Sequence, residues 1–176
     1  MMEKTLVMKF GGTSLGSDKI IRQASSLIRT ARAEWPRVAV IVSAMNGVTN
    51  ALLDGAHTAS SGDRSHYREI GELLREQHEY TIESILAKPD ERKGAYHQVE
   101  THVGEYYAMC HAVQVLGEAS PRALDAISCL GERIANHILA AHLRENGCSA
   151  EAVGANELIL TDAVFQAASP NMAATR

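Results

Sequence analysis

The first 43 residues decide the fold. They contain two apolar runs, TLVMKF at residues 5–10 and RVAVIVS at residues 37–43, and such runs are typical of buried β-strands. Between them, apolar residues recur at helical spacing over 18–34, and Pro36 ends the pattern. A strand, a helix and a strand form a βαβ unit, which predicts a parallel pair in an α/β fold. The second run is apolar on both faces, so we expect helices on both sides of the sheet.

The rest of the sequence is mainly helical. In chain order we expect a short helix ending near His57, two long helices at 64–87 and 91–117, a helix from Pro121 to about Glu145, a third strand at 149–155, a small hairpin at 165–168 and a helix from Pro170. The two long helices flank Pro89 and should form an antiparallel hairpin. Three strands with this many helices make an under-filled sheet. We therefore expect residues 1–176 to be one part of a larger α/β domain.

Composition excludes several classes of protein. Of 176 residues, 45% are hydrophobic and 22% are charged, which is ordinary for a globular domain. The net charge of −4 argues against a dedicated nucleic-acid binder, and no apolar run is long enough to span a bilayer. Three cysteines without CxxC spacing predict neither a disulfide framework nor a zinc site. We therefore expect a reduced, cytoplasmic protein that binds neither nucleic acid nor membrane.

The first candidate site follows the first strand. Lys9 is followed by Gly11 and Gly12, by the hydroxyls of Thr13 and Ser14, and then by a helix. Backbone amides, a helix N-terminus and a lysine together suit phosphate oxygens. The lysine precedes the glycines, so the motif is not a Walker A loop. An ordinary tight turn with a surface lysine is an equally open reading of this motif alone.

Two more candidates lie further along the chain. Ser43 and Thr49 follow the second strand, where open α/β sheets bind ligands, although a polar loop with helix caps is the simpler reading. Glu132 follows Gly131, a position where another backbone or a ligand can approach closely. A carboxylate there suits a cationic amine. The alternative is a solvated acid paired with Arg133 or a nearby lysine.

The sequence predicts no resident metal site. The eight histidines are scattered over the helical patterns without an HExxH motif, so we interpret them as surface or helix-packing residues.

Four stretches, in this order, resemble the aspartokinases of the amino-acid kinase family. They are VMKFGGTS at 7–14, VSAMNGVTN at 42–50, LGERIAN at 130–136, and ELILTD with SPNMAATR at 157–162 and 169–176. The resemblance implies an αβα sandwich of the amino-acid kinase type, incomplete here, with the helical pair at 64–117 as an insertion. It also implies transfer of the γ-phosphoryl group of Mg²⁺-bound ATP to the β-carboxylate of L-aspartate. This reaction is the first step towards lysine, threonine and methionine.

The resemblance assigns roles to individual residues. Lys9 corresponds to the catalytic lysine that contacts the phosphates, and Gly11, Gly12, Thr13 and Ser14 correspond to the first phosphate loop. Ser43 and Thr49 correspond to positions that hold aspartate. Glu132 corresponds to the acid that pairs with the α-ammonium group of the substrate. A homo-oligomer is also implied.

The sequence departs from the family in several places. Cys129 and Asn46 stand where many relatives have serine and glycine. The Gly-Arg-Gly-Gly-Ser-Asp loop, the nucleotide-binding half and the regulatory ACT domains of relatives have no counterpart in these residues. We therefore expect an aspartate-side portion of a kinase domain that is inactive alone. The alternatives are a non-catalytic binding or assembly module, and the kinase part of a bifunctional aspartokinase/homoserine dehydrogenase. A kinase for another acid, such as glutamate, is a third reading, against which the KFGGTS string argues.

Overall fold

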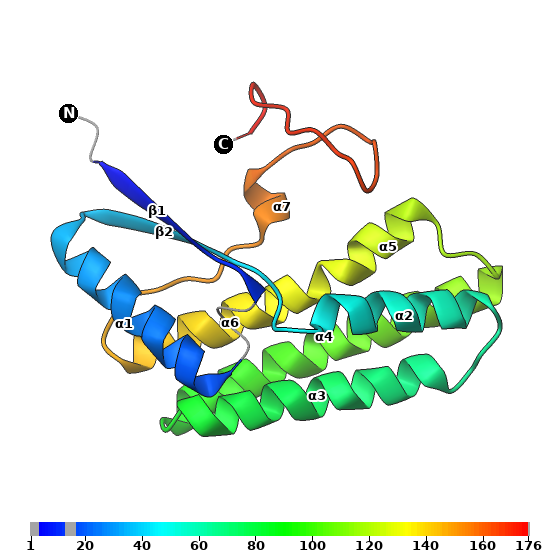
Figure 1. Cartoon of the computed structure of the whole chain (residues 1–176), viewed down its shortest axis with the longest axis horizontal. Coiled ribbons are helices and arrows are strands. Elements are labelled where there is room, and N and C mark those ends of the chain that lie inside the picture. Colours follow the sequence, from blue (N-terminus) through cyan, green and yellow to red (C-terminus); the bar gives the residue numbers. More distant parts are fainter. Residues whose placement is uncertain (1–3, 13–16, 176) are drawn as a thin grey trace.

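The computed structural model describes residues 4–12 and 17–175. Strands β1 (Thr5–Phe10) and β2 (Arg37–Val42) pair in parallel, and helix α1 (Asp18–Glu34) connects them. The predicted βαβ unit is confirmed, with boundaries within one residue (Figure 1). Phe10 lies opposite Val42 in the register. The segments that follow the two strands therefore leave the sheet at the same edge.

The predicted helical hairpin is also confirmed. After α2 (Val48–Ser60), the chain forms α3 (His66–Ile85) and α4 (Pro89–Leu116), with Pro89 at the first turn of α4. The two helices run antiparallel in a layer below the sheet (Figure 1). They pack mainly against α2 and α6 and not against the strands. Their apolar faces are thereby buried within the chain.

The single helix predicted from Pro121 to Glu145 is wrong, because the structure divides it into α5 (Pro121–Ser128) and α6 (Leu130–Glu145). Cys129 separates them, with φ −72° and ψ −9°. At the break, the Ser128 hydroxyl donates to the carbonyl of Asp125 and the Cys129 thiol donates to that of Ala126. The Cys129 amide still donates to Asp125, so the interruption is local, and the two side-chain bonds compete with helical hydrogen bonds at this point.

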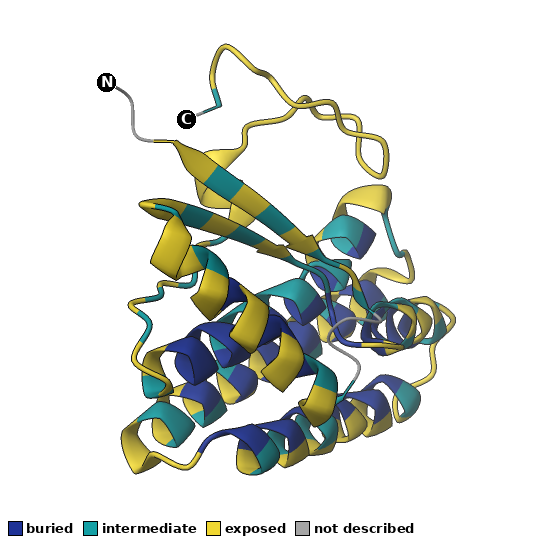
Figure 2. Cartoon of the chain, turned by 60° about the vertical axis from the view of Figure 1, so that its left-hand side comes forward, coloured by how far each residue is buried: buried dark blue, intermediate teal, exposed yellow. Residues whose placement is uncertain are grey.

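Only one face of the sheet is covered by helices, so the expectation of cover on both faces is wrong for the described residues. Exposure alternates along both strands, and Val7 and Ile41 on the outer face are 60% and 51% exposed. Helices α1 and α6 pack on the inner face. Figure 2 shows the buried residues gathered in the helices below the strands. An apolar strand pattern predicts that both faces can be buried, but it does not show which chain segment covers each face.

The predicted third strand at 149–155 is absent from the described residues, whose sheet has two strands. Side chains of α6 hold this segment instead: Asn136 donates to the carbonyl of Val153, and Arg144 donates to that of Ala150. A cavity of about 280 Å³ lies between β2, α1, α6 and residues 148–151. The segment therefore runs past β2 without a ladder of hydrogen bonds.

The C-terminal expectations were partly wrong. A one-turn helix, α7 (Ala155–Leu158), forms where no helix was predicted. The predicted hairpin arm is reduced to a single antiparallel bridge between Thr161 and Pro170. No helix begins at Pro170: residues 172–174 form a turn, and the Asn171 amide donates to the carbonyl of Leu160. Residues 155–174 are exposed over nearly their whole length (Figure 2).

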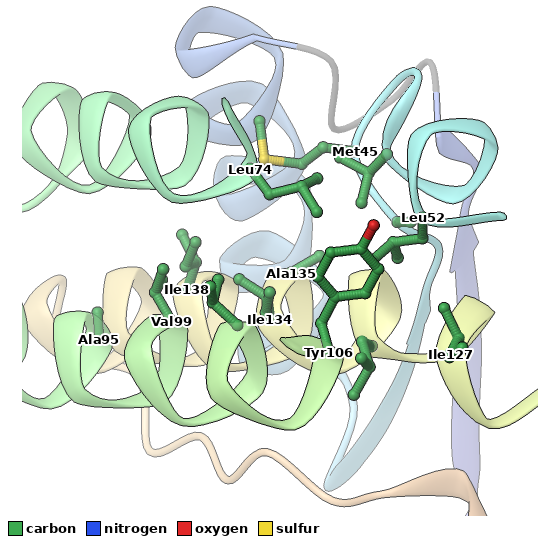
Figure 3. Close-up of a cluster of buried hydrophobic side chains, with 14 of the residues drawn as sticks. Met45, Leu52, Leu74, Ala95, Val99, Tyr106, Ile127, Ile134, Ala135 and Ile138 are labelled. Atoms are coloured by element: carbon green, nitrogen blue, oxygen red, sulfur yellow. The ribbon is translucent and has the colours of Figure 1, made fainter. Parts of the chain in front are cut away.

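The core lies between the helices. Figure 3 shows Tyr106 rising from α4 towards Leu52 of α2 and Met45 of the β2–α2 loop. Tyr106 and Leu52 are 0% and 2% exposed, so this cluster ties the loop to the helical layer. Among the helices of the described residues, none is long and apolar enough to cross a membrane.

Candidate substrate-binding site

Two of the predicted motifs meet where the strands end. An ideal Cβ built on Gly12 would lie 3.0 Å from the carbonyl oxygen of Ala44 and 3.8 Å from the Ser43 hydroxyl. The backbone after β1 therefore touches the backbone after β2. A side chain at position 12 would crowd a carbonyl oxygen, which explains the need for glycine.

The third motif reaches the same loop from the other side. An ideal Cβ on Gly131 would lie 2.8 Å from the Cβ of Ala44 and 2.7 Å from Cγ1 of Val48. Ala44 and Val48 are buried, at 3% and 1% exposure. Another chain segment does approach Gly131 closely, as predicted, but through the side chains of Ala44 and Val48 and not through a backbone or a ligand. Sequence reasoning missed Ala44 as the meeting point, since a small apolar residue in a polar loop carries no chemical signal.

Glu132, which follows Gly131, has a carboxylate oxygen that lacks a hydrogen-bond donor in the described part of the chain. It lies in the first turn of α6, where the helix dipole favours a carboxylate. Its Oε2 is buried, and no described group forms a hydrogen bond to it. Arg133 does not pair with it, because the Arg133 guanidinium donates to Glu105 on α4 at 3.4 Å. A buried carboxylate oxygen without a donor is costly and calls for a cationic partner.

The predicted aspartate-binding residues flank the meeting point. Ser43 follows β2 directly, and Thr49 is the second residue of α2; both are half-buried. Gly47, between them, has φ 82°, a left-handed conformation that glycine adopts without strain. This turn lets α2 begin immediately after the loop.

The predicted phosphate-binding residues are only partly described. Lys9 lies near the end of β1 with an exposed side chain, opposite Ile41 in the register. Gly11 is exposed, and a Cβ there would meet nothing within 4 Å. Thr13 and Ser14 lie outside the described residues. The structure thus brings Gly12, Ser43 and the N-terminal turn of α6 together, with Lys9 at the edge where the two strands end.

Cys129 borders Glu132 at the start of α6. Burial raises the pKa of its thiol, an effect that Arg133 opposes and Glu132 reinforces. The neutral thiol is therefore the dominant form near neutral pH, and Cys129 supplies no charge to the site.

A second hollow lies close by. A pocket of about 540 Å³ opens beside Met45, between the start of α1 and residues 73–81 of α3. None of the predicted site residues lines it, so we do not assign it to the substrate. Within residues 4–12 and 17–175, no three histidine, cysteine or acidic side chains form a metal-binding group.

The family follows from comparison with known proteins. The sequence model described as "Amino acid kinase family" matches residues 4–172. The chain belongs to the amino acid kinase family. The match covers nearly the whole chain and agrees with the family resemblance of the four sequence motifs.

Within the family, the chain is similar to aspartokinases. It is 31% identical to "Aspartokinase" of Candida albicans over 92% of its own length and 30% of that relative. It is 31% identical to "Aspartokinase 1, chloroplastic" of Arabidopsis thaliana, over 90% of the chain and 27% of the relative. "Bifunctional aspartokinase/homoserine dehydrogenase 1, chloroplastic" of the same plant is 29% identical over 88% of the chain and 16% of the relative. The chain spans about a third or less of these relatives.

Solved structures confirm the fold. "E. coli aspartokinase III in complex with aspartate and ADP (R-state)" superposes with a TM-score of 0.82 at 21% identity. The match covers 97% of this chain and 35% of that one. The helical hairpin and the short parallel sheet are therefore the arrangement of a known amino-acid kinase fold, and not an isolated helical bundle.

Proposed function

We propose that this chain forms the aspartate-binding side of an aspartate kinase. In the proposed reaction, the γ-phosphoryl group of ATP passes to the β-carboxylate of L-aspartate, which opens the synthesis of lysine, threonine and methionine. The similarity to aspartokinases supports this reaction, as does the aspartate and ADP complex of the similar E. coli enzyme. Phosphoryl transfer needs positioning and charge neutralisation more than covalent chemistry.

One observation carries the proposal: Glu132 has a buried oxygen that is unpaired among the described residues, and the residue before it, Gly131, contacts the Ser43–Thr49 loop. An α-ammonium group supplies the positive charge and the donors that this carboxylate lacks. The hydroxyls of Ser43 and Thr49 are suited to bind the carboxylates of the same amino acid. Glu132 is therefore assigned to the α-ammonium group, and Ser43 and Thr49 to the rest of aspartate.

Lys9, Gly11, Gly12, Thr13 and Ser14 are assigned to the phosphates. Lys9 would neutralise charge that develops on the transferring group, which is where a cation accelerates phosphoryl transfer most. Mg²⁺ in kinases is held largely by substrate phosphates. The absence of a three-ligand acidic cluster from the described residues is thus compatible with Mg²⁺ that arrives bound to ATP.

As 176 residues, the chain is expected to bind aspartate weakly and to turn over no ATP. In aspartokinases an arginine and an aspartate of the Gly-Arg-Gly-Gly-Ser-Asp loop complete the site, and this string does not occur here. Positioning by both sides of such a site is worth about 7–11 kcal/mol of barrier. A binding or assembly role without catalysis is the second candidate, favoured by the outer sheet face that the chain leaves open.

The test is isothermal titration of the purified chain with L-aspartate, with D-aspartate and L-glutamate as comparisons, alongside a coupled assay of ADP release. We expect saturable binding that prefers L-aspartate, and no ADP release above background. Lys9→Ala should leave this binding unchanged, since Lys9 is assigned to phosphate. Absence of aspartate binding would refute the proposed site. Turnover comparable to intact aspartokinases would refute the claim that these 176 residues hold only part of the catalytic site.

We also infer a cytoplasmic, reducing compartment and a homo-oligomer. The three cysteines are all free, which supports the compartment, although several relatives carry the word chloroplastic in their names. The homo-oligomer and the absence of nucleic-acid binding stay predictions.

A further inference from the structure

We propose that Gly131 is a positioning residue, which holds Glu132 against the β2–α2 loop because it has no side chain. This inference rests on the proposed aspartate site, since it concerns how that site is built. Ala44 is the centre of the arrangement: its carbonyl faces Gly12 and its Cβ faces Gly131. Glu132 follows Gly131 directly, so the seat of the loop on α6 also sets where the carboxylate lies.

The contact at Gly131 leaves no room for a methyl group. Distances of 2.7 and 2.8 Å to Val48 Cγ1 and Ala44 Cβ are shorter than carbon atoms tolerate. The loop cannot move easily, because Met45 is also buried and its Sδ lies 3.9 Å from the hydroxyl oxygen of Thr81 on α3. On the α6 side, Ile134 is 3% exposed and belongs to the same core. A substitution at position 131 must therefore separate the loop from the helix.

Two other helical glycines have no such contact and serve as controls. Gly94 and Gly104 lie inside α4, and a Cβ on either would meet nothing within 4 Å. Alanine at such positions is tolerated and even favours the helix. Gly131→Ala and Gly104→Ala are thus the same chemical change. Gly131→Ala crowds the loop, whereas Gly104→Ala does not.

The geometry predicts a loss of aspartate affinity that exceeds any general loss of structure. We expect Gly131→Ala to weaken aspartate binding by about tenfold or more, because misplacement on the ångström scale is enough to cost such factors. Gly104→Ala should bind as the parent chain does. Adding Ala44→Gly and Val48→Ala to Gly131→Ala removes both crowding atoms and should restore most of the affinity. Mere helix destabilisation would not be reversed by changes in the loop.

The experiment measures aspartate affinity by calorimetry for the parent, Gly131→Ala, Gly104→Ala, the triple variant and the Ala44→Gly/Val48→Ala background. In parallel, ¹³C NMR follows the side-chain carboxyl of Glu132 without ligand, assigned with Glu132→Gln. We expect this resonance to move in Gly131→Ala and to return in the triple variant. If Gly131→Ala does not fold, Val48→Ile crowds the same contact from the loop side and should give the same two effects.

The outcomes separate the two proposals. If the parent chain binds no aspartate, the proposed function fails, while the Glu132 resonance still tests the positioning. A resonance and an affinity that are unchanged in Gly131→Ala would overturn the inference, as would a loss that the triple variant does not reverse.

Discussion

Glu132 carries a buried oxygen that nothing in the described chain satisfies. A residue chosen for stability alone would not be a carboxylate at this place, because an unpaired buried acceptor lowers the free energy of unfolding. Its neighbour Arg133 is engaged with Glu105, which also accepts a hydrogen bond from His102 at 3.1 Å. Two adjacent residues of α6 thus differ: Arg133 is paired and contributes to stability, whereas Glu132 is unpaired within the described chain, lowers stability and is explained by the proposed function.

The first prediction concerns Glu132→Gln, which preserves shape and removes charge. We expect aspartate binding to be lost while the free energy of unfolding stays equal or rises, since the buried Oε2 of Glu132 has no partner among the described residues. Glu105→Gln is the matched control: it removes an acid that is paired, so it should lower stability and leave aspartate binding unchanged. Calorimetric titration and urea unfolding measure the two quantities. A drop in stability without loss of binding in Glu132→Gln would contradict the assignment.

At the scale of elements, the packing of α2 on α4 depends on a second close approach. Gly55 of α2 faces Tyr106 of α4, whose hydroxyl is the nearest atom to where a Cβ would lie. Tyr106 is fully buried, and its hydroxyl has no hydrogen-bond partner among the described residues. The close packing of α2 on α4, which supports the β2–α2 loop, therefore requires glycine at position 55.

The second prediction is a double-mutant cycle at this contact. Gly55→Ala should lower the free energy of unfolding by about 1–3 kcal/mol or more, because it overpacks the core. Tyr106→Phe should be neutral or stabilising alone, since it removes an unsatisfied hydroxyl. Combined, the two changes should cost less than their sum, although Cζ of Tyr106 and Cδ1 of Ile70 remain 3.2 and 3.3 Å from the added methyl. Urea unfolding gives the coupling; strict additivity would contradict the proposed contact.

At the scale of the whole molecule, charge and burial predict how stability responds to pH. Burial lowers the pKa of His78, His137 and His142. His78 donates from Nδ1 to the carbonyl of Leu74, and its Nε2 is buried without a partner. Protonation of Nε2 would therefore place an unsatisfied charge in the core.

The third prediction follows from the sign of these shifts. A histidine with a lowered pKa binds fewer protons folded than unfolded, so stability is unaffected well above pH 6.5 and falls as the pH drops below it. We expect the free energy of unfolding to decrease between pH 7.5 and 5.5, and His78→Leu to reduce that slope. Exposed His66 opposes the trend, because its hydrogen bond to Asp54 raises its pKa. Urea unfolding across this range measures the slope; a slope that His78→Leu leaves unchanged would exclude His78 as a source.

Local sequence patterns were enough to predict the first βαβ unit and the family. Helical spacing over 18–34 and the two apolar runs predicted α1, β1 and β2 to within one residue, because these patterns act between neighbours along the chain. Contacts between separate segments decided the conformation of residues 149–155, which were predicted wrongly as a strand. In this segment the side chains of Asn136 and Arg144 bind the carbonyls of Val153 and Ala150.

The arrangement of the candidate site depends on tertiary packing. The sequence named Gly12, Ser43 and Glu132 but left each with an ordinary alternative, since a turn glycine, a loop serine and a helix acid are common. Packing removed one alternative at Glu132, because Arg133 pairs with Glu105 instead. It also brought three motifs to Ala44, which carries no signal of its own. Contacts between segments nearly 90 residues apart depend on how whole helices pack, and this is a property that no local pattern contains.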